Sequence, residues 1–186
     1  MLLLLLGIAL FAAVHFIPSL APSLKVAWVQ RMGENGYKGV FSLLLLAALA
    51  MIIVGWRSAT PVYLYTPPAI LYPIALGVMI FAFALLVVSN RASRLSRLIR
   101  HPQLTGVALW GVAHLLLNGD SRSMALFAGL SLWAVAEIIA INRREGVWIK
   151  SAAPAWGSEL VTLIITAIVV AVVIAVHPWL AGVAVL

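Results

Sequence analysis

The stretch LVTLIITAIVVAVVIAV at residues 160–176 contains no charged side chain over 17 residues. A helix that crosses the apolar core of a bilayer needs roughly 17–25 such residues. Five further apolar runs, one of them short, occur at residues 1–21, 39–56, 69–89, 103–117 and 124–141. None alternates apolar and polar residues as a barrel strand does. The sequence therefore predicts an all-α, polytopic membrane helical bundle of about six transmembrane helices.

The composition excludes several classes of protein. Of the 186 residues, 65% are hydrophobic and 9% are charged, whereas soluble domains carry roughly 25% charged residues. This excludes an ordinary soluble enzyme, a disordered chain and a nucleic-acid-binding domain. The chain contains no cysteine, so it has no thiolate nucleophile and no cysteine-ligated metal centre. We expect a single transmembrane domain over residues 1–186.

The distribution of cations predicts the orientation in the membrane. Alternate connections between the six segments hold ten of the twelve Lys and Arg residues: Lys25, Arg31, Lys38, Arg91, Arg94, Arg97, Arg100, Arg143, Arg144 and Lys150. Cytoplasmic loops carry the Lys and Arg excess, which predicts that both termini lie outside. No basic residue precedes the first Leu run, which favours a retained helix over a cleaved signal peptide.

Two histidines lie within the predicted spans. If the first helix continues to Lys25, His15 lies about 15 Å from the cytoplasmic boundary, and His114 lies about 18 Å from it by the helical rise after Pro102. Imidazole binds haem iron, copper, zinc and non-haem iron. We therefore interpret His15 and His114 as candidate ligands of one metal centre. The alternative is that each makes an interhelical hydrogen bond.

Other residues surround these histidines in the sequence. Trp110 and Asn118 share a helix face with His114 at a spacing of four, and Gly111 would let a flat group or a helix approach that face. His101 lies thirteen residues before His114, so the two side chains point to roughly opposite sides of a helix. We expect His101 at the basic interface and His177 at the outer one.

The remaining charged groups have simpler interpretations. Glu137 lies near the cytoplasmic end of its span, where we expect it to pair with a nearby arginine. The arginines at residues 91, 94, 97 and 100 recur at a spacing of three, which on a helix would place them round one side. They could contact anionic lipid headgroups or neutralise cofactor carboxylates such as haem propionates, and the sequence does not separate these uses.

A signature of motifs resembles the NnrU family of bacterial membrane proteins: RHPQLTG at residues 100–106, Leu109-Trp110, Ala113-His114-Leu115, Asn118-Gly119-Asp120, and His15 followed by Arg31, Gly33 and Tyr37. The family includes the plant zeta-carotene cis–trans isomerase, a membrane enzyme with haem b on two histidines. The resemblance implies haem b on His15 and His114, with Trp110, Asn118, Arg100 and His101 as further cofactor-binding residues.

The resemblance also implies a location and a set of roles. It places the chain as a multi-pass protein in the bacterial inner (cytoplasmic) membrane, surrounded by lipid. The family name links it to nitrite and nitric oxide reduction (denitrification), and the plant relative implies redox-dependent haem isomerisation of a hydrophobic polyene. The Asn118-Gly119-Asp120 turn differs from the plant enzyme, which affects the carotenoid substrate more than haem binding. Nitric oxide and respiratory reductase subunits are the other expected partners.

Two alternatives belong to other functional classes. Arg100-His101-Pro102 also resembles the isoprenylcysteine and phospholipid methyltransferases, although the region from Arg143 to Trp148 lacks their paired glutamates. Binding of S-adenosylmethionine would support that interpretation. The third hypothesis is a non-catalytic assembly subunit of a respiratory reductase, which would co-purify with the reductase and carry no chromophore.

Overall fold

The computed structural model describes residues 1–150 and 152–185, which are mostly helical and form no strand beyond one isolated bridge. The long helices are α1 (Leu2–Leu20), α2 (Pro22–Ser58), α3 (Leu71–Val88), α4 (Pro102–Leu115), α6 (Gly129–Glu145) and α7 (Trp156–Ala181). A 3₁₀ turn η1 (Leu95–Arg97) precedes α4, while α5 (Ser121–Ser123) and the π-helical η2 (Met124–Ala128) lead directly into α6. The predicted all-helical membrane fold is confirmed, with a helix at each of the six predicted segments. Which side of the membrane the termini face stays a prediction.

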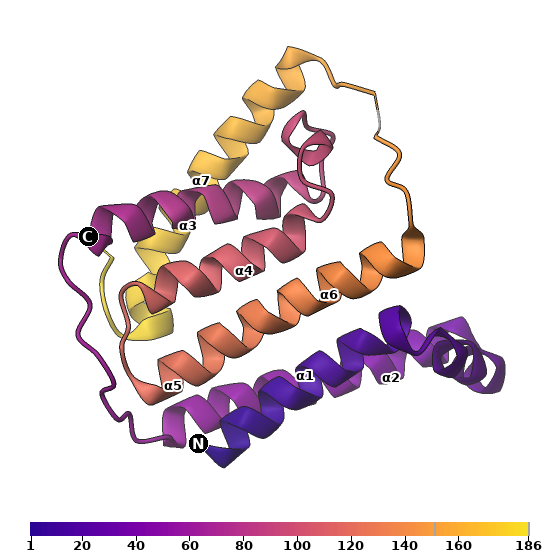
Figure 1. Ribbon diagram of the computed structural model, residues 1–186, viewed down its shortest axis with the longest axis horizontal. Helices are drawn as coiled ribbons and strands as arrows, with labels where there is room; N and C mark the ends of the chain where they lie inside the picture. Colours follow the sequence, from indigo (N-terminus) through magenta and orange to yellow (C-terminus); the bar gives the residue numbers. More distant parts are fainter. Residues whose placement is uncertain (151, 186) are drawn as a thin grey trace.

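The long helices pack as a row of neighbours. α2 contacts α1, α1 contacts α6, α6 contacts α4, α4 contacts α3, and α3 contacts α7. Figure 1 shows α6 between α1 on one side and α4 on the other, with α4 and α6 antiparallel. The predicted hairpin of the fourth and fifth helices is therefore confirmed. α6 is the element that joins the α1–α2 pair to the α3–α4 pair.

One helix differs from the prediction, and a second one is short, as predicted. α2 begins at Pro22 rather than at residue 39 and is interrupted at Gly33, whose φ of 74° breaks the helical backbone. Its first part carries several charged residues, so the apolar pattern did not reveal it. α4 has only 14 residues, or about 21 Å of helix, which is shorter than a bilayer core of roughly 30 Å. The other five helical segments, with residues 121–145 counted as one, are long and apolar enough to span.

Apolar side chains cover the outside of the spans. In the five spanning helices, between 11% and 33% of the most apolar 18-residue window is buried inside the protein. Leu46, Leu132 and Leu163 lie within these spans and are 61–70% exposed. Such surfaces are stable only against lipid or another apolar partner. The fold is therefore that of a membrane protein in which only a small part of each span is buried against other helices.

Small residues set the distance between neighbouring helices. A Cβ added to Gly55 would lie 2.4 Å from the backbone nitrogen of Leu4, so α2 approaches the start of α1 closely. A Cβ added to Gly111 would lie 2.1 Å from Ser131 Oγ and 2.6 Å from the carbonyl oxygen of Phe127. Membrane helices commonly associate through such small residues. The prediction that Gly111 permits a close approach is confirmed, and its partner is α6.

A segment after α2 covers the turn between α4 and α5. The amides of Leu64 and Tyr65 donate to the carbonyl of Gly119 at 2.7 and 3.1 Å, and the amide of Ser121 donates to the carbonyl of Val62 at 2.8 Å. The Tyr65 hydroxyl donates to the carbonyl oxygens of Leu115 and Asn118. These bonds fix the end of α4 that carries His114.

Asp120 caps the helix that begins after this turn. Its Oδ1 accepts hydrogen bonds from the amides of Arg122 and Ser123 at 3.1 Å, and its Oδ2 accepts one from the Ser123 hydroxyl at 2.5 Å. Partial burial raises the pKa of Asp120, but the bonds from Ser123 and Arg122 and the Arg122 charge lower this pKa by more. The folded state therefore favours the carboxylate.

We expect Gly111→Ala to destabilise the protein because the added methyl group meets backbone and side-chain atoms of α6. Overpacking of this kind costs about 1–3 kcal/mol. Thermal unfolding in detergent measures the effect. Gly77→Ala is the matched control, since nothing lies within 4 Å of its added Cβ. An equal loss in both variants would contradict close packing at Gly111.

We expect Asp120→Ala to lower stability by about 1 kcal/mol through loss of the cap, and Asp120→Asn to retain most of it. The wild-type advantage over the alanine variant should be complete above the unfolded-state pKa of about 3.9 and disappear as pH falls through the lower folded-state pKa. Unfolding curves at several pH values measure this. An advantage that persists unchanged at acid pH would show that the carboxylate is not the cap.

Candidate functional site

His15 lies on α1 inside a group of aromatic rings. Its ring centroid is 4.2 Å from that of Phe11, one turn earlier, 4.8 Å from Trp133 of α6 and 5.8 Å from Phe41 of α2. The side chain of Trp133 in turn meets Phe11 edge-on at 4.9 Å. The imidazole is half-buried and is held by three different helices.

His114 lies in a second aromatic group, near the opposite end of the bundle. Its ring stacks on Phe127 of η2 at 4.2 Å with an interplanar angle of 17°, and lies 4.8 Å from Trp110. Phe127 also contacts Trp110 at 4.9 Å and Trp56 of α2 at 6.1 Å. The predicted proximity of Trp110 to His114 is confirmed.

The two histidines share one hydrogen-bond arrangement. Nδ1 of His15 lies 2.9 Å from the carbonyl oxygen of Phe11, and Nδ1 of His114 lies 2.8 Å from that of Trp110. A carbonyl oxygen only accepts, so Nδ1 carries the proton in each ring and Nε2 keeps its lone pair in the neutral imidazole. Among the described residues, no hydrogen bond to either Nε2 is found. Histidines that bind metals typically donate their other N–H to a carbonyl in this way.

The structure does not bring the two rings into contact. His114 packs on Phe127 of η2, and His15 packs on Trp133 of α6. These two aromatic residues are six positions apart in the continuous helical segment formed by residues 121–145, which corresponds to about 9 Å along a helix. The expectation that His15 and His114 lie at similar depth, from the estimates of about 15 and 18 Å, is therefore wrong. It assumed that the first helix runs to Lys25, but α1 ends at Leu20, so His15 is only about 7.5 Å from the end of its helix.

Asn118 lies beyond the end of α4 but remains linked to His114. Its Nδ2 donates to the carbonyl of His114 at 2.8 Å, and its backbone amide donates to the same oxygen at 2.8 Å. Asn118 therefore terminates the helix and fixes the backbone under His114. No hydrogen bond joins its side chain to the imidazole ring among the described residues.

Glu137 does not pair with an arginine, in contrast to the prediction. Its Oε2 accepts a hydrogen bond of 3.0 Å from the hydroxyl of Ser19 on α1, and the residue is 6% exposed. The nearby Arg144 donates instead to the carbonyl of Pro18 at 2.5 Å and pairs with Glu145. The carboxyl group therefore joins α1 to α6, one turn from the contact of His15 with Trp133.

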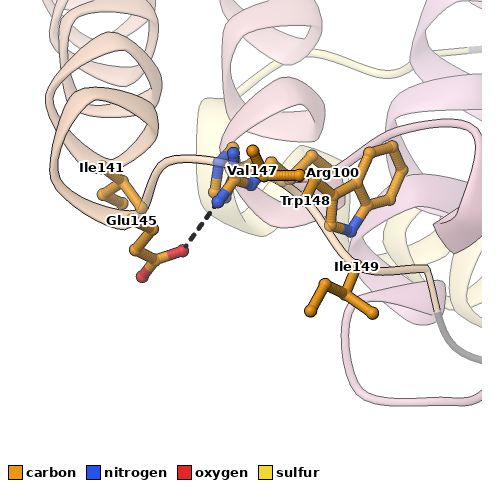
Figure 2. A pocket seen from close by; sticks show the side chains of 7 residues that line it. Arg100, Ile141, Glu145, Val147, Trp148 and Ile149 are labelled. Carbon is orange, nitrogen blue, oxygen red and sulfur yellow. Dashed lines mark hydrogen bonds and ion pairs between the residues drawn. The ribbon is translucent and has the colours of Figure 1, made fainter.

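Arg100 and His101 lie together, away from His114. They line a pocket of about 480 Å³ at the other end of α4, together with Ile141, Glu145, Val147, Trp148 and Ile149. Arg100 donates to the carbonyl of Gly146 at 2.7 Å and pairs with Glu145 at 3.3 Å (Figure 2). The Nε2 of His101 lies 2.9 Å from Oδ1 of Asn142. Thirteen residues of helix, or about 20 Å, separate His101 from His114.

The arginines at residues 91–100 do not lie on one helix. Only η1 is helical in this connection, and Arg91 and Arg94 contact α7 whereas Arg100 contacts the end of α6. Arg91 lies 3.4 Å from Thr162 of α7, and the Arg94 guanidinium stacks over Trp156 at 4.1 Å.

His177 is on α7, where its Nδ1 bonds to the carbonyl of Val183 at 2.7 Å.

Three aromatic residues that position the histidines were not predicted from the sequence. Phe11, Phe127 and Trp133 look like ordinary apolar residues of a membrane span. The only available signal was their spacing, since Phe11 precedes His15 by four residues as Trp110 precedes His114. The contacts across helices could not be read from the sequence.

Comparison with known proteins identifies one family. The model of a family described as NnrU protein matches residues 3–185, nearly the whole chain. No curated protein and no solved structure matches.

We expect Ser19→Ala to destabilise the protein by about 1–3 kcal/mol, because the buried Glu137 carboxyl group loses its donor. Adding Glu137→Met should recover much of this loss, since replacing both partners by apolar groups is nearly neutral. Thermal unfolding in detergent measures both variants. A double variant less stable than Ser19→Ala would show that Glu137 has another partner.

Proposed function

Because the chain belongs to the NnrU family, we propose that it is an integral membrane protein that binds haem b through His15 and His114. The observation that carries the proposal is the shared state of the two imidazoles. Each donates Nδ1–H to the carbonyl one turn earlier, which leaves Nε2 free to bind a metal. The donor chemistry of both residues therefore fits haem iron.

The chain's own residues determine how each ligand is held. Phe11 and Trp110 provide the accepting carbonyls, while Trp133 and Phe127 limit rotation of the rings. A haem held by both residues would take one ligand from α1 and one from α4, the two helices that pack on either side of α6.

A bound haem would supply a redox-active iron in a water-poor environment. This chemistry supports two roles in the bacterial inner membrane. One is redox-dependent cis–trans isomerisation of a hydrophobic polyene that enters from the lipid, and the other is a nitric-oxide-responsive function in denitrification, with respiratory reductase subunits as partners. The exposed apolar faces of the spans favour a substrate that arrives through the membrane.

Absorption spectra of the purified, haem-loaded protein test the proposal. We expect a Soret band in the wild type, a shifted and weaker band in His15→Ala and in His114→Ala, and loss of the band in the double variant. His177→Ala is the matched control because this histidine also has its Nδ1 bonded to a carbonyl, but on α7. A band that survives in the double variant would remove the assignment.

A further inference from the structure

We propose that the pocket beside Arg100 binds the phosphate headgroup of an anionic phospholipid from the surrounding membrane. This site is separate from the proposed haem ligands, because it lies at the opposite end of α4 from His114. It does not depend on whether haem binds. Its walls come from the start of α4, the end of α6 and the loop after α6 (Figure 2).

Arg100 is the arginine that lines the pocket. Arg100 is partly buried, with 18% of its side chain exposed. Of its five N–H groups, the structure pairs those that point to Gly146 and Glu145. Lys150 lies 5.1 Å above the ring of Trp148, which also lines the pocket. A guanidinium group in the lining, with an ammonium group over the ring of the lining residue Trp148, favours a phosphate.

The apolar part of the pocket identifies the source of that phosphate as lipid. Val147 and Ile149, on either side of Trp148, are each 90% exposed. Isolated aliphatic side chains so close to the end of a spanning helix are suited to contact acyl chains, and tryptophan is enriched at the membrane–water interface. A free phosphate ion would make no use of these three residues.

Glu145 limits the affinity of the site for an anion. Its carboxylate lies 3.3 Å from Arg100 and 3.0 Å from Arg144, and it lines the same pocket. An arriving phosphate must compete with this carboxylate for the guanidinium group. Removing the negative charge at residue 145 should therefore strengthen binding, which a purely structural role of Arg100 would not produce.

Native mass spectrometry of the detergent-purified full chain tests the proposal with phosphatidylglycerol and phosphatidylcholine as probes. We expect the wild type to retain phosphatidylglycerol in preference. Arg100→Gln should weaken its binding roughly fivefold, the factor for about 1 kcal/mol per cation near an anionic surface. Glu145→Gln should strengthen binding by a similar factor. Arg31→Gln, an exposed cation outside the pocket, should change little.

Several outcomes would overturn the proposal. Equal retention of the two lipids by the wild type would contradict a phosphate-specific site. An equal loss in Arg31→Gln and Arg100→Gln would show a diffuse effect of the basic surface. No gain in Glu145→Gln would show that Arg100 acts only within the fold. Displacement of phosphatidylglycerol by low concentrations of inorganic phosphate would show that the site binds the free anion instead.

Discussion

α6 packs between α1 and α4 and holds the two halves of the bundle together. α6 contacts α4 through Gly111 and Ser131, where no side chain larger than hydrogen fits, and contacts α1 through the bond between Ser19 and Glu137. Of the other long helices, α2 packs on α1, α3 packs on α4, and α7 packs on α3. His15 packs on Trp133 of α6 and His114 packs on Phe127 just before α6. The position of this segment therefore also determines where the two candidate ligands lie.

The hydrogen bond from each imidazole to its own helix connects this architecture to function. A histidine in a membrane span must satisfy its polar atoms within the protein. His15 and His114 satisfy only Nδ1, by bonds to carbonyl groups on the same helix, and neither uses a neighbouring helix as a hydrogen-bond partner. The expected alternative, an interhelical bond, is therefore not found among the described residues. The arrangement leaves a ligand atom available at each of the two sites.

The apolar runs were sufficient to predict the six helical segments, because membrane spans of about 20 residues leave a continuous signal. The same signal failed at the start of α2, where charged residues mix with apolar ones, and gave no indication of the break at Gly33. The pairing of Glu137 with Ser19 was also unpredictable, since the two are 118 residues apart and a serine has no distinguishing pattern.

The candidate ligands could be identified from the sequence, whereas their relation in space could not. Intramembrane histidines are few, so His15 and His114 stand out in the chain. Their relative depth depended on where α1 ends, and the break before Pro22 moved that end by five residues from the assumed position. Phe127 and Trp133, on which the two rings pack, have no sequence pattern that distinguishes them from other apolar residues of a membrane span.

Electron paramagnetic resonance of the oxidised, haem-loaded protein would show whether His15 and His114 both bind the iron, because the spin state reports the ligands of the iron. Coordination by both imidazoles predicts a low-spin ferric signal in the wild type that becomes high-spin when either His15 or His114 is replaced by alanine. A wild-type signal that is already high-spin, or a low-spin signal that neither replacement alters, would contradict the account.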